Sequence, residues 1–145
     1  MCYTGSLFEE EILAECIFEW NTYVDYAKCI ELVKANQPKF WNPCDPPTAA
    51  ANDLHALIVE ALNEQYDNVR LFTALRTPLD RYHGVDCFVE YGKKIVTIDV
   101  TINSHKQDYK ADFILSENDI YNDEGKVNQT GLRLKAQIMA KALAA

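Results

Sequence analysis

The expected fold of this chain follows from one segment, Gly84-Val-Asp-Cys-Phe-Val-Glu-Tyr-Gly-Lys-Lys-Ile-Val-Thr-Ile-Asp-Val-Thr-Ile102. On either side of Gly92-Lys93, β-branched and aromatic residues alternate with polar ones, which is typical of two β-strands. A two-residue corner with glycine first suits a tight antiparallel hairpin. Tyr91 then pairs with Lys94, and the numbers of any two opposed residues sum to 185.

This register places Asp86 opposite Asp99. Directly opposed residues hold their Cβ atoms roughly 4.5–5.5 Å apart, and two like charges at that distance repel each other. A divalent cation, Mg²⁺ or Mn²⁺, would turn the repulsion into binding, because its usual ligands are carboxylates, water and phosphate oxygens. The alternative is a pair of aspartates on a wet sheet face, screened by water. Asp86 and Asp99 are therefore the candidate metal ligands.

Alternation along the hairpin separates a core face from a mixed face. The core face is expected to carry Val85, Cys87, Val89, Tyr91, Val96, Ile98, Val100 and Ile102. The mixed face is expected to carry Asp86, Phe88, Glu90, Ile95, Thr97, Asp99 and Thr101. Aromatic and β-branched residues between the acids predict partial cover, and half-covered carboxylates are often found where metal or proton chemistry occurs.

The length and composition predict one domain over 1–145, because a chain of this size buries roughly two thirds of its unfolded surface. In it, an N-terminal helix and Pro-rich loop over 1–47 precede a core over 48–145. No apolar stretch approaches the roughly 20 residues of a membrane span, and the acidic N-terminal region lacks the basic segment of a signal peptide. The five scattered cysteines fit a reducing compartment. We expect a cytoplasmic protein without a membrane partner.

Capping residues and apolar periodicity predict the helices. Ser6 and Glu9 form a capping box, and the apolar residues that follow predict one long helix over 7–35, ended by the prolines of 36–47. Its apolar stripe is Leu13, Ile17, Trp20, Val24 and Ala27. A second helix begins after Thr48 or Asp53, and Glu60 and Glu64 border its apolar stripe, where either could lean over a sheet edge. The alternative is that both are a charged flank bordering the core.

The remaining elements follow from turn formers and short apolar runs. The sequence predicts strands over 69–75 and 111–115, and a loop over 77–83. Asn128 or Thr130 caps a final helix. This helix is expected to turn Leu134, Ile138, Met139 and Leu143 inward.

Charge is divided unevenly along the chain, whose net charge is −8. Residues 1–68 hold 12 acidic and 3 basic residues, and residues 69–145 hold 10 acidic and 11 basic residues. Overall acidity opposes non-specific binding to nucleic acid, because phosphate contacts dominate such binding. Any nucleic-acid surface should therefore use the cations of the second half, unless these only solubilise the surface. They include Arg70, Arg76, Arg81, Lys106, Lys110, Arg133, Lys135 and Lys141.

The order helix, strand, Gly-Val-Asp strand, short turn and Ile-Asp-Val-Thr strand resembles the core of the PD-(D/E)xK, or restriction-endonuclease-like, nuclease superfamily. The resemblance covers roughly residues 48–110. It implies an α+β fold with a central mixed or antiparallel sheet of about four strands flanked by helices. It also implies Mg²⁺ or Mn²⁺ bound by Asp86 and Asp99, and DNA as the partner.

The resemblance further implies a lysine that orients the attacking water and a glutamate from a preceding helix. The family lysine follows the second acid by two residues, where this chain has Thr101, which carries no positive charge. Lys106 or Lys110, shortly after the strand, could return a charge to the site. The glutamate would be Glu64 or Glu60, and the segment Thr4-Gly-Ser-Leu-Phe-Glu9 also resembles the family's helix entry.

Two functions are consistent with these residues. The first is a metal-dependent DNA endonuclease, a phosphodiesterase in which Asp86 and Asp99 hold the metal, Glu64 or Glu60 completes the site and Lys106 aids the water. The second is an inactive nuclease-like scaffold that binds a protein or competes with nucleic acid through its acidic surface. In this second case, Trp20, Tyr23 and Tyr26 of the long helix could form a homodimer face.

Overall fold

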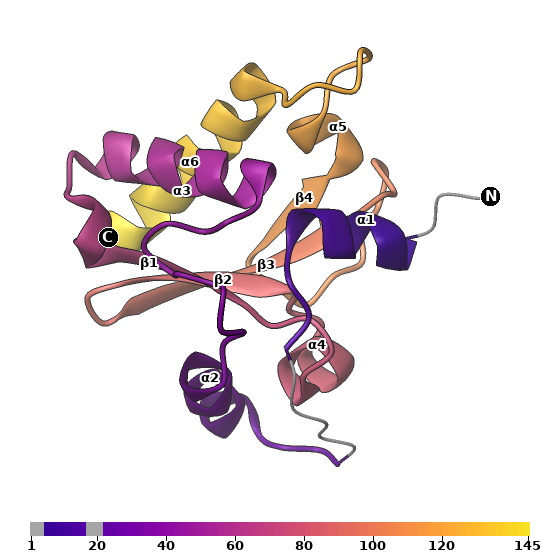
Figure 1. Cartoon of the computed structure of the whole chain (residues 1–145), viewed down its shortest axis with the longest axis vertical. Coiled ribbons are helices and arrows are strands. Elements are labelled where there is room, and N and C mark those ends of the chain that lie inside the picture. The colour runs from indigo at the N-terminus through magenta and orange to yellow at the C-terminus, as the bar shows by residue number, and fades with distance from the viewer. Residues whose placement is uncertain (1–4, 17–21) are drawn as a thin grey trace.

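A four-stranded sheet crosses the middle of the molecule (Figure 1). The structure is a computed structural model that describes residues 5–16 and 22–145. The strands lie in the order β1 (Val69–Thr73), β2 (Cys87–Tyr91), β3 (Lys94–Thr101) and β4 (Phe113–Ser116). The first three are antiparallel, and β4 runs parallel to β3. The expected α+β fold with a mixed sheet flanked by helices is confirmed.

The predicted hairpin register is also confirmed. Tyr91 pairs with Lys94 and Cys87 pairs with Ile98. Gly92 occupies the corner with a φ of +61°, a conformation that glycine adopts without steric cost. The ladder ends at Cys87, so Asp86 lies one residue outside it.

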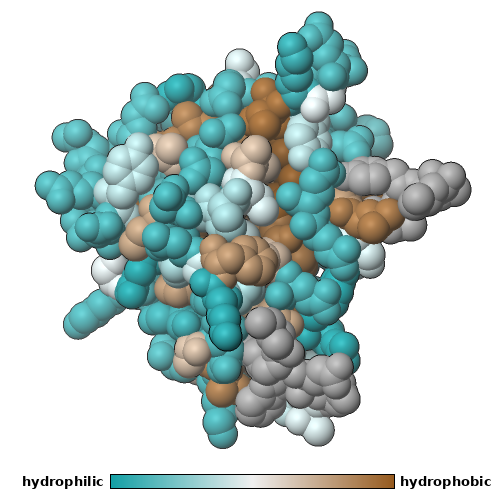
Figure 2. All heavy atoms as spheres, viewed as in Figure 1, coloured by the Kyte–Doolittle hydropathy of each residue, from teal (hydrophilic) through white to brown (hydrophobic). Residues whose placement is uncertain are grey.

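Helices cover both faces of the sheet (Figure 1). The α-helices are α1 (Gly5–Ile12), α2 (Tyr26–Ala35), α3 (Ala49–Leu62), α4 (Pro78–His83), α5 (Glu117–Ile120) and α6 (Gln129–Ala144), with a 3₁₀ turn η1 (Tyr66–Asn68). The α1, α3 and α6 helices pack against one face, and α2 and α4 against the other. The side seen in Figure 2 is mostly hydrophilic. Within the described residues, no helix is both long and apolar enough to cross a bilayer.

The long helix predicted over 7–35 is wrong. The first helix ends at Ile12, and α2 begins after Asp25, whose carboxylate accepts a hydrogen bond from the backbone N–H of Lys28 at 3.0 Å. Between them, the N–H of Cys16 donates to the carbonyl of Leu75 at 3.1 Å. This long-range pairing draws the chain into an extended path that local apolar periodicity does not reveal. Ile17 and Trp20, which belong to the predicted stripe, lie outside the described residues.

The loop predicted over 77–83 is the helix α4. Pro78 stands in its first turn, where the missing N–H of proline costs nothing. Gly84 ends the helix with a φ of +67°. Asp80 therefore lies on a helix, and this changes the composition of the candidate site.

The two faces of the hairpin have the expected character, with one exception. Cys87, Val89, Val96, Ile98 and Val100 lie in the core cluster with α3 and α6, as predicted. Val85, predicted for the same face, instead packs in the second cluster. The alternation of the strand does not extend past its first residue, Cys87, so it cannot assign Val85 to a face.

The mixed face is covered by α2 and α4. Phe88 is fully buried there, and Glu90 is 5% exposed. The Glu90 carboxylate pairs with Lys34 Nζ at 2.6 Å and with the guanidinium of Arg70. Two cations thus compensate this buried acid, and they link α2 and β1 to β2.

The final helix α6 is capped by Asn128, one of the two predicted caps, and it buries Met139 and Leu143 as predicted but not the other two residues expected inward. The Asn128 side chain accepts from the backbone N–H of Gly131 at 3.0 Å. The buried residues are Leu132, Ala136, Met139, Ala140 and Leu143. Leu134 and Ile138, predicted to lie inward, are 59% and 51% exposed. The helix has two apolar stripes, and only its packing on α3 and the sheet selects between them.

This choice of face can be tested with two leucine substitutions in α6. Leu132→Ala should lower the free energy of unfolding by roughly 2–5 kcal/mol, because it opens a cavity in the core. The matched control Leu134→Ala should change it by less than about 0.5 kcal/mol, because that side chain is largely in water. Urea unfolding followed by circular dichroism measures both. Equal losses would contradict the buried face.

Candidate metal centre

The site begins with Asp86, which directly precedes β2. Its N–H donates to the carbonyl of Ile98 at 2.9 Å, and its carbonyl accepts from Ala74 N–H at 2.8 Å. Its Oδ2 accepts from the backbone N–H of Val100 at 2.7 Å. The carboxylate therefore takes the place of a backbone partner at the end of the hairpin, and Asp86 is only 4% exposed.

Two further acids converge on Asp86. Glu9 of α1 and Asp80 of α4 each bring a carboxylate oxygen close to Asp86, and the three oxygens lie within 4.8 Å of one another. The neighbouring residue Phe8 is fully buried in the core, which fixes α1 over this end of the sheet. We call Glu9, Asp80 and Asp86 the acid cluster.

Burial and the neighbouring charges raise the pKa values of two carboxyls of the acid cluster, Asp86 and Glu9. The pKa of Asp86 is raised, first by burial and then by the charges of Asp80 and Glu9, although the hydrogen bond from Val100 opposes the shift. The pKa of Glu9 is also raised, first by burial and then by Asp80. Closely spaced carboxylates in a poorly hydrated site disfavour full ionisation, so they retain protons or require cations.

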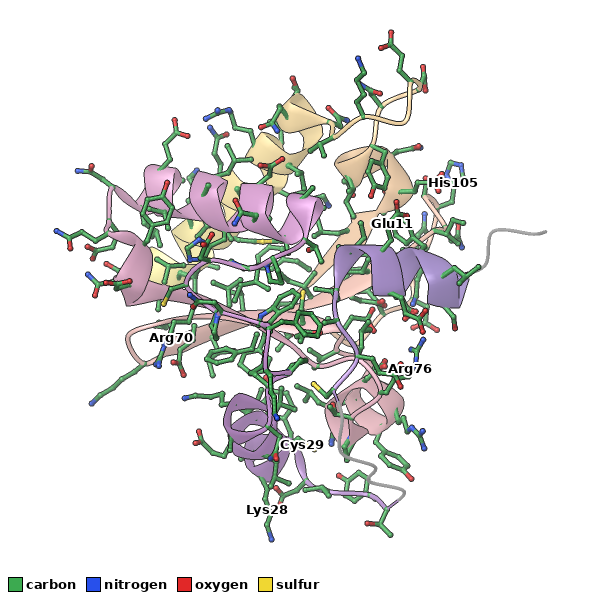
Figure 3. The ribbon with its side chains drawn as sticks, viewed as in Figure 1. Glu11, Lys28, Cys29, Arg70, Arg76 and His105 are labelled. Carbon is green, nitrogen blue, oxygen red and sulfur yellow. The ribbon has the colours of Figure 1, made fainter. Side chains whose placement is uncertain are left out.

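Arg76 is the first cation at the cluster, and Figure 3 shows it between α1 and α4. The backbone N–H of Arg76 donates to Asp80 Oδ2 at 2.9 Å. The backbone φ of Arg76 is +68°, which is uncommon for a residue other than glycine. Its guanidinium lies 3.8 Å from Asp80, 3.9 Å from Glu9 and 3.4 Å from Glu10. These separations are long for ion pairs, so Arg76 compensates the cluster only in part.

Lys106 is the second cation, and it reaches the site from the connection between β3 and β4. Its Nζ lies 2.7 Å from Asp99 Oδ2, and Asp99 is 7% exposed. The hydrogen bond with Asp99 is the main cause that raises the pKa of Lys106, and the charges of Asp86 and Glu9 add to it. Lys106 is therefore held as an ammonium ion next to the acid cluster.

Asp99 lies beside the acid cluster, and its strongest contact is with Lys106. The direct opposition of Asp86 and Asp99 predicted from the hairpin is not part of the ladder, which ends with Cys87 paired to Ile98. The acids that close on Asp86, however, are Glu9 and Asp80. Thr101 accepts a hydrogen bond on its hydroxyl from the N–H of Asn103 at 3.1 Å, so the position of the family lysine here supports a turn.

Glu64 and Glu60, the two favoured helix acids, lie elsewhere. Glu64 accepts from the hydroxyl of Tyr91 at 2.8 Å. Tyr91 is at the other end of β2, about 17 Å from Asp86 at the usual rise of a strand. Glu60 pairs with Arg133 at 3.1 Å. Of the three alternatives for the helix acid, the structure brings Glu9 to Asp86.

Lys110, the alternative to Lys106, also lies near the site. Its side chain packs beside Gly84, where an added Cβ would be 3.6 Å from that of Lys110. Gly84 directly follows α4, and Asp86 and then β2 follow in the chain. Lys110 thus adds an exposed cation to this end of the molecule.

The donor set of the acid cluster suits a hard divalent cation. Carboxylate oxygens are the protein ligands that Mg²⁺ prefers, at about 2.1 Å. Two oxygens on one such ion are at most about 4.2 Å apart, so a small contraction of the cluster suffices. Glu9, Asp80 and Asp86 could therefore hold a metal ion.

Asp80 is the residue that the sequence analysis missed. The signal for its helix is present, because Thr77 precedes Pro78 and an acid follows in the first turn. These residues are sufficient to predict α4 from the sequence. Nothing local indicates that α4 approaches α1 and the end of the sheet, since residues 9 and 80 are far apart in the chain.

The charge of the acid cluster predicts how stability depends on pH without metal. A carboxyl whose pKa folding raises contributes stability that is complete below its unfolded pKa, about 4, and is lost as the pH rises through its folded pKa. Glu9→Gln removes one charge and should increase stability more at about pH 8 than at about pH 5. The gain should be on the order of 1 kcal/mol or less, because Glu9 is partly solvated.

Thermal unfolding in EDTA at the two pH values measures this difference. Glu60→Gln, which alters an exposed acid outside the cluster, is the control and should show no such pH dependence. An equal effect of Glu9→Gln at both pH values would show that its charge is not opposed by the neighbouring acids.

Comparison of this chain with protein-family models, with curated proteins and with solved structures found no match. The chemistry of the site is therefore inferred from its own residues. These are three converging carboxylates, Arg76 beside them, and the ion pair of Asp99 with Lys106.

Proposed function

We propose that the protein is a metal-dependent phosphodiesterase that cleaves DNA and uses Mg²⁺ or Mn²⁺ at the acid cluster. One observation carries this proposal: the carboxylate oxygens of Glu9, Asp80 and Asp86 lie within 4.8 Å of one another. Three carboxylates this close repel one another, and a bound divalent cation would offset that repulsion directly. The adjoining pair of Asp99 and Lys106 adds a fixed ammonium next to the site where a phosphate would lie.

The proposed reaction is hydrolysis of a phosphodiester. A water oxygen forms a bond to phosphorus as the bond from phosphorus to one sugar oxygen breaks. The water gives up a proton, and the departing sugar oxygen gains one. The bound metal would polarise the phosphate and lower the pKa of its bound water.

Lys106 and Arg76 serve as fixed positive charges in this proposal. Lys106 cannot act as the base, because Asp99 raises its pKa and keeps it protonated. Its ammonium instead favours the negative charge that develops on the phosphate oxygens. Arg76 offsets part of the negative charge of the acid cluster when no metal is bound.

The same residues support a restriction-endonuclease-like core. A hairpin supplies an acid from the start of one strand and another from the next, Asp86 and Asp99, and Glu9 supplies the helix acid. The lysine would be relocated from position 101 to Lys106, which reaches the same strand end from the following connection. The chain uses Asp80 in addition to these family positions.

DNA would meet the end of the sheet that carries the acid cluster. Arg76, Arg81, Lys106 and Lys110 belong to elements at this end. Arg70 and Arg133, also expected to contact phosphates, instead pair with Glu90 and Glu60. The proposed phosphate contacts are therefore few and local.

The second candidate function is an inactive scaffold of the same fold that binds a protein partner or a second copy of itself. One observation favours it: Arg76 already lies beside Asp80 and Lys106 already pairs with Asp99, so part of the negative charge at the site is compensated by side chains. Of the aromatic residues proposed for a homodimer, Tyr23 and Tyr26 are exposed, and Trp20 lies outside the described residues.

Ligand substitutions distinguish the two functions. Asp80→Asn should weaken Mn²⁺ binding by at least tenfold and Mn²⁺-dependent cleavage of plasmid DNA by at least a hundredfold, because it removes a charged ligand. Glu60→Gln and Glu64→Gln, matched changes of acids remote from the cluster, should leave both unchanged. Titration calorimetry and gel assays measure these effects. Absence of metal binding and of cleavage in the wild-type protein would favour the inactive scaffold.

Lys106 should affect the chemical step more than metal binding. Lys106→Met should lower kcat by about 10²–10³-fold, the usual cost of removing one group that stabilises a developing anion. Mn²⁺ affinity should change far less, because Lys106 contacts Asp99 and is not a ligand. Lys106→Arg should retain more activity than Lys106→Met. A loss of metal affinity equal to the loss of kcat would assign Lys106 a structural role.

A further inference from the structure

Three tyrosines with exposed rings gather on α4, at the start of α2 and on the segment before α2. Tyr23, Tyr26 and Tyr82 are 65%, 46% and 36% exposed. The ring centroid of Tyr23 lies 5.6 Å from that of Tyr82 and 5.5 Å from that of His83. Tyr26 lies 5.8 Å from His83. We call Tyr23, Tyr26 and Tyr82 the tyrosine surface.

The tyrosine surface is held in position by a backbone contact. Nε2 of His83 lies 2.8 Å from the carbonyl oxygen of Val24, between the first two tyrosines of the surface. Val24 also packs against the core cluster beneath α2 and α4. The rings are therefore ordered before any ligand binds, which lowers the entropic cost of stacking on them.

The helix α4 joins the tyrosine surface to the acid cluster. Asp80, Arg81 and Tyr82 are consecutive, and successive side chains of a helix are about 100° apart. The exposed residue Arg81 thus lies between the acid and the ring around the helix. Asp80 and Tyr82 are about 200° apart around the helix, so a strand that joins them has to pass over Arg81.

Charge favours a single-stranded ligand over a duplex. Duplex DNA carries one charge per about 1.7 Å and is bound mainly through many phosphate contacts. This chain has a net charge of −8, and the proposed phosphate contacts at the site are few. Single strands need fewer cations, because each base that stacks on an aromatic ring adds roughly 1–3 kcal/mol.

We infer that the tyrosine surface binds unpaired bases of a single-stranded nucleic acid and directs the strand over Arg81 to the acid cluster. This inference rests on the proposed function, because it names the substrate class of the same site. Tyr23 and Tyr82 supply the stacking faces, and Arg81 meets the backbone between them and Asp80. DNA and RNA single strands share this chemistry, since every base has a π-face.

Fluorescence anisotropy in EDTA, where no cleavage occurs, tests the tyrosine surface. Labelled oligo-dT, oligo-U and a duplex of equal length are the probes at low salt. The wild-type protein should bind at least one single strand more tightly than the duplex. Tyr23→Ala and Tyr82→Ala should each weaken that binding about fivefold or more, the lower end expected for the loss of one stacked base.

Two control variants separate stacking from folding. Tyr23→Trp preserves an aromatic face and should retain binding. Phe40→Ala removes an aromatic side chain that is 66% exposed elsewhere and should have no effect. Thermal unfolding checks that each variant is folded. Equal or tighter binding of the duplex, or full binding by both alanine variants, would overturn the inference.

A separate cleavage assay in Mn²⁺ tests the proposed function with the same oligonucleotides. Tyrosine-dependent binding in EDTA without cleavage in any metal would support the tyrosine surface and overturn the nuclease. Cleavage of the duplex with no preference for single strands would support the nuclease and overturn the tyrosine surface. Preference for oligo-dT or for oligo-U assigns the substrate to DNA or to RNA.

Discussion

The bond from the Val100 N–H to the Asp86 carboxylate, at 2.7 Å, is the interaction on which the candidate site depends. Where the ladder between β2 and β3 ends, this side chain replaces a backbone carbonyl and keeps a buried N–H satisfied. The carboxylate is consequently fixed at the end of the sheet, in a place from which water is largely excluded. Glu9 and Asp80 are significant because they approach an acid that cannot move away.

Buried acids of this protein differ in how they are compensated. Glu90, near the hairpin corner, has Lys34 and Arg70, and Asp99 has Lys106. Asp86 has a backbone N–H and two other acids as its neighbours. A buried anion without a close cation is costly to a fold. This cost is concentrated at one end of the sheet, where it raises the pKa values of Asp86 and Glu9 and so favours their protonated forms.

Local chemistry explains which parts of the fold could be predicted. The corner at Gly92 and the alternation around it predicted the hairpin and its register, because both depend on neighbours in the chain. The single long helix was wrong because the pairing of Cys16 with Leu75 overrides local periodicity. The inward face of α6 was partly wrong because Leu134 and Leu132 belong to competing apolar stripes. Such choices are made by tertiary packing, which one sequence does not display.

The candidate site shows the same division. The hairpin predicted Asp86 directly opposite Asp99, a pair that the ladder does not include. Lys106 was predicted to return a charge to the site, and it pairs with Asp99. Glu9 was one of three possible helix acids, and Asp80 was absent, since its helix was taken for a loop. What brings residues 9, 80 and 86 together is the docking of α1 and α4 on the sheet, a contact between segments with no shared local pattern.

Asp86 is held in the sheet both by its backbone and by its carboxylate, so its structural role does not depend on any chemistry at the site. Because its carboxylate accepts from the Val100 N–H, replacement of Asp86 would break a contact with β3 whether or not a metal ion binds. Glu9 lies on α1 and faces Arg76 at 3.9 Å, so its loss would leave the strands joined. A substitution at position 9, unlike one at position 86, therefore changes the charge of the acid cluster and leaves the hydrogen bonds of the sheet intact.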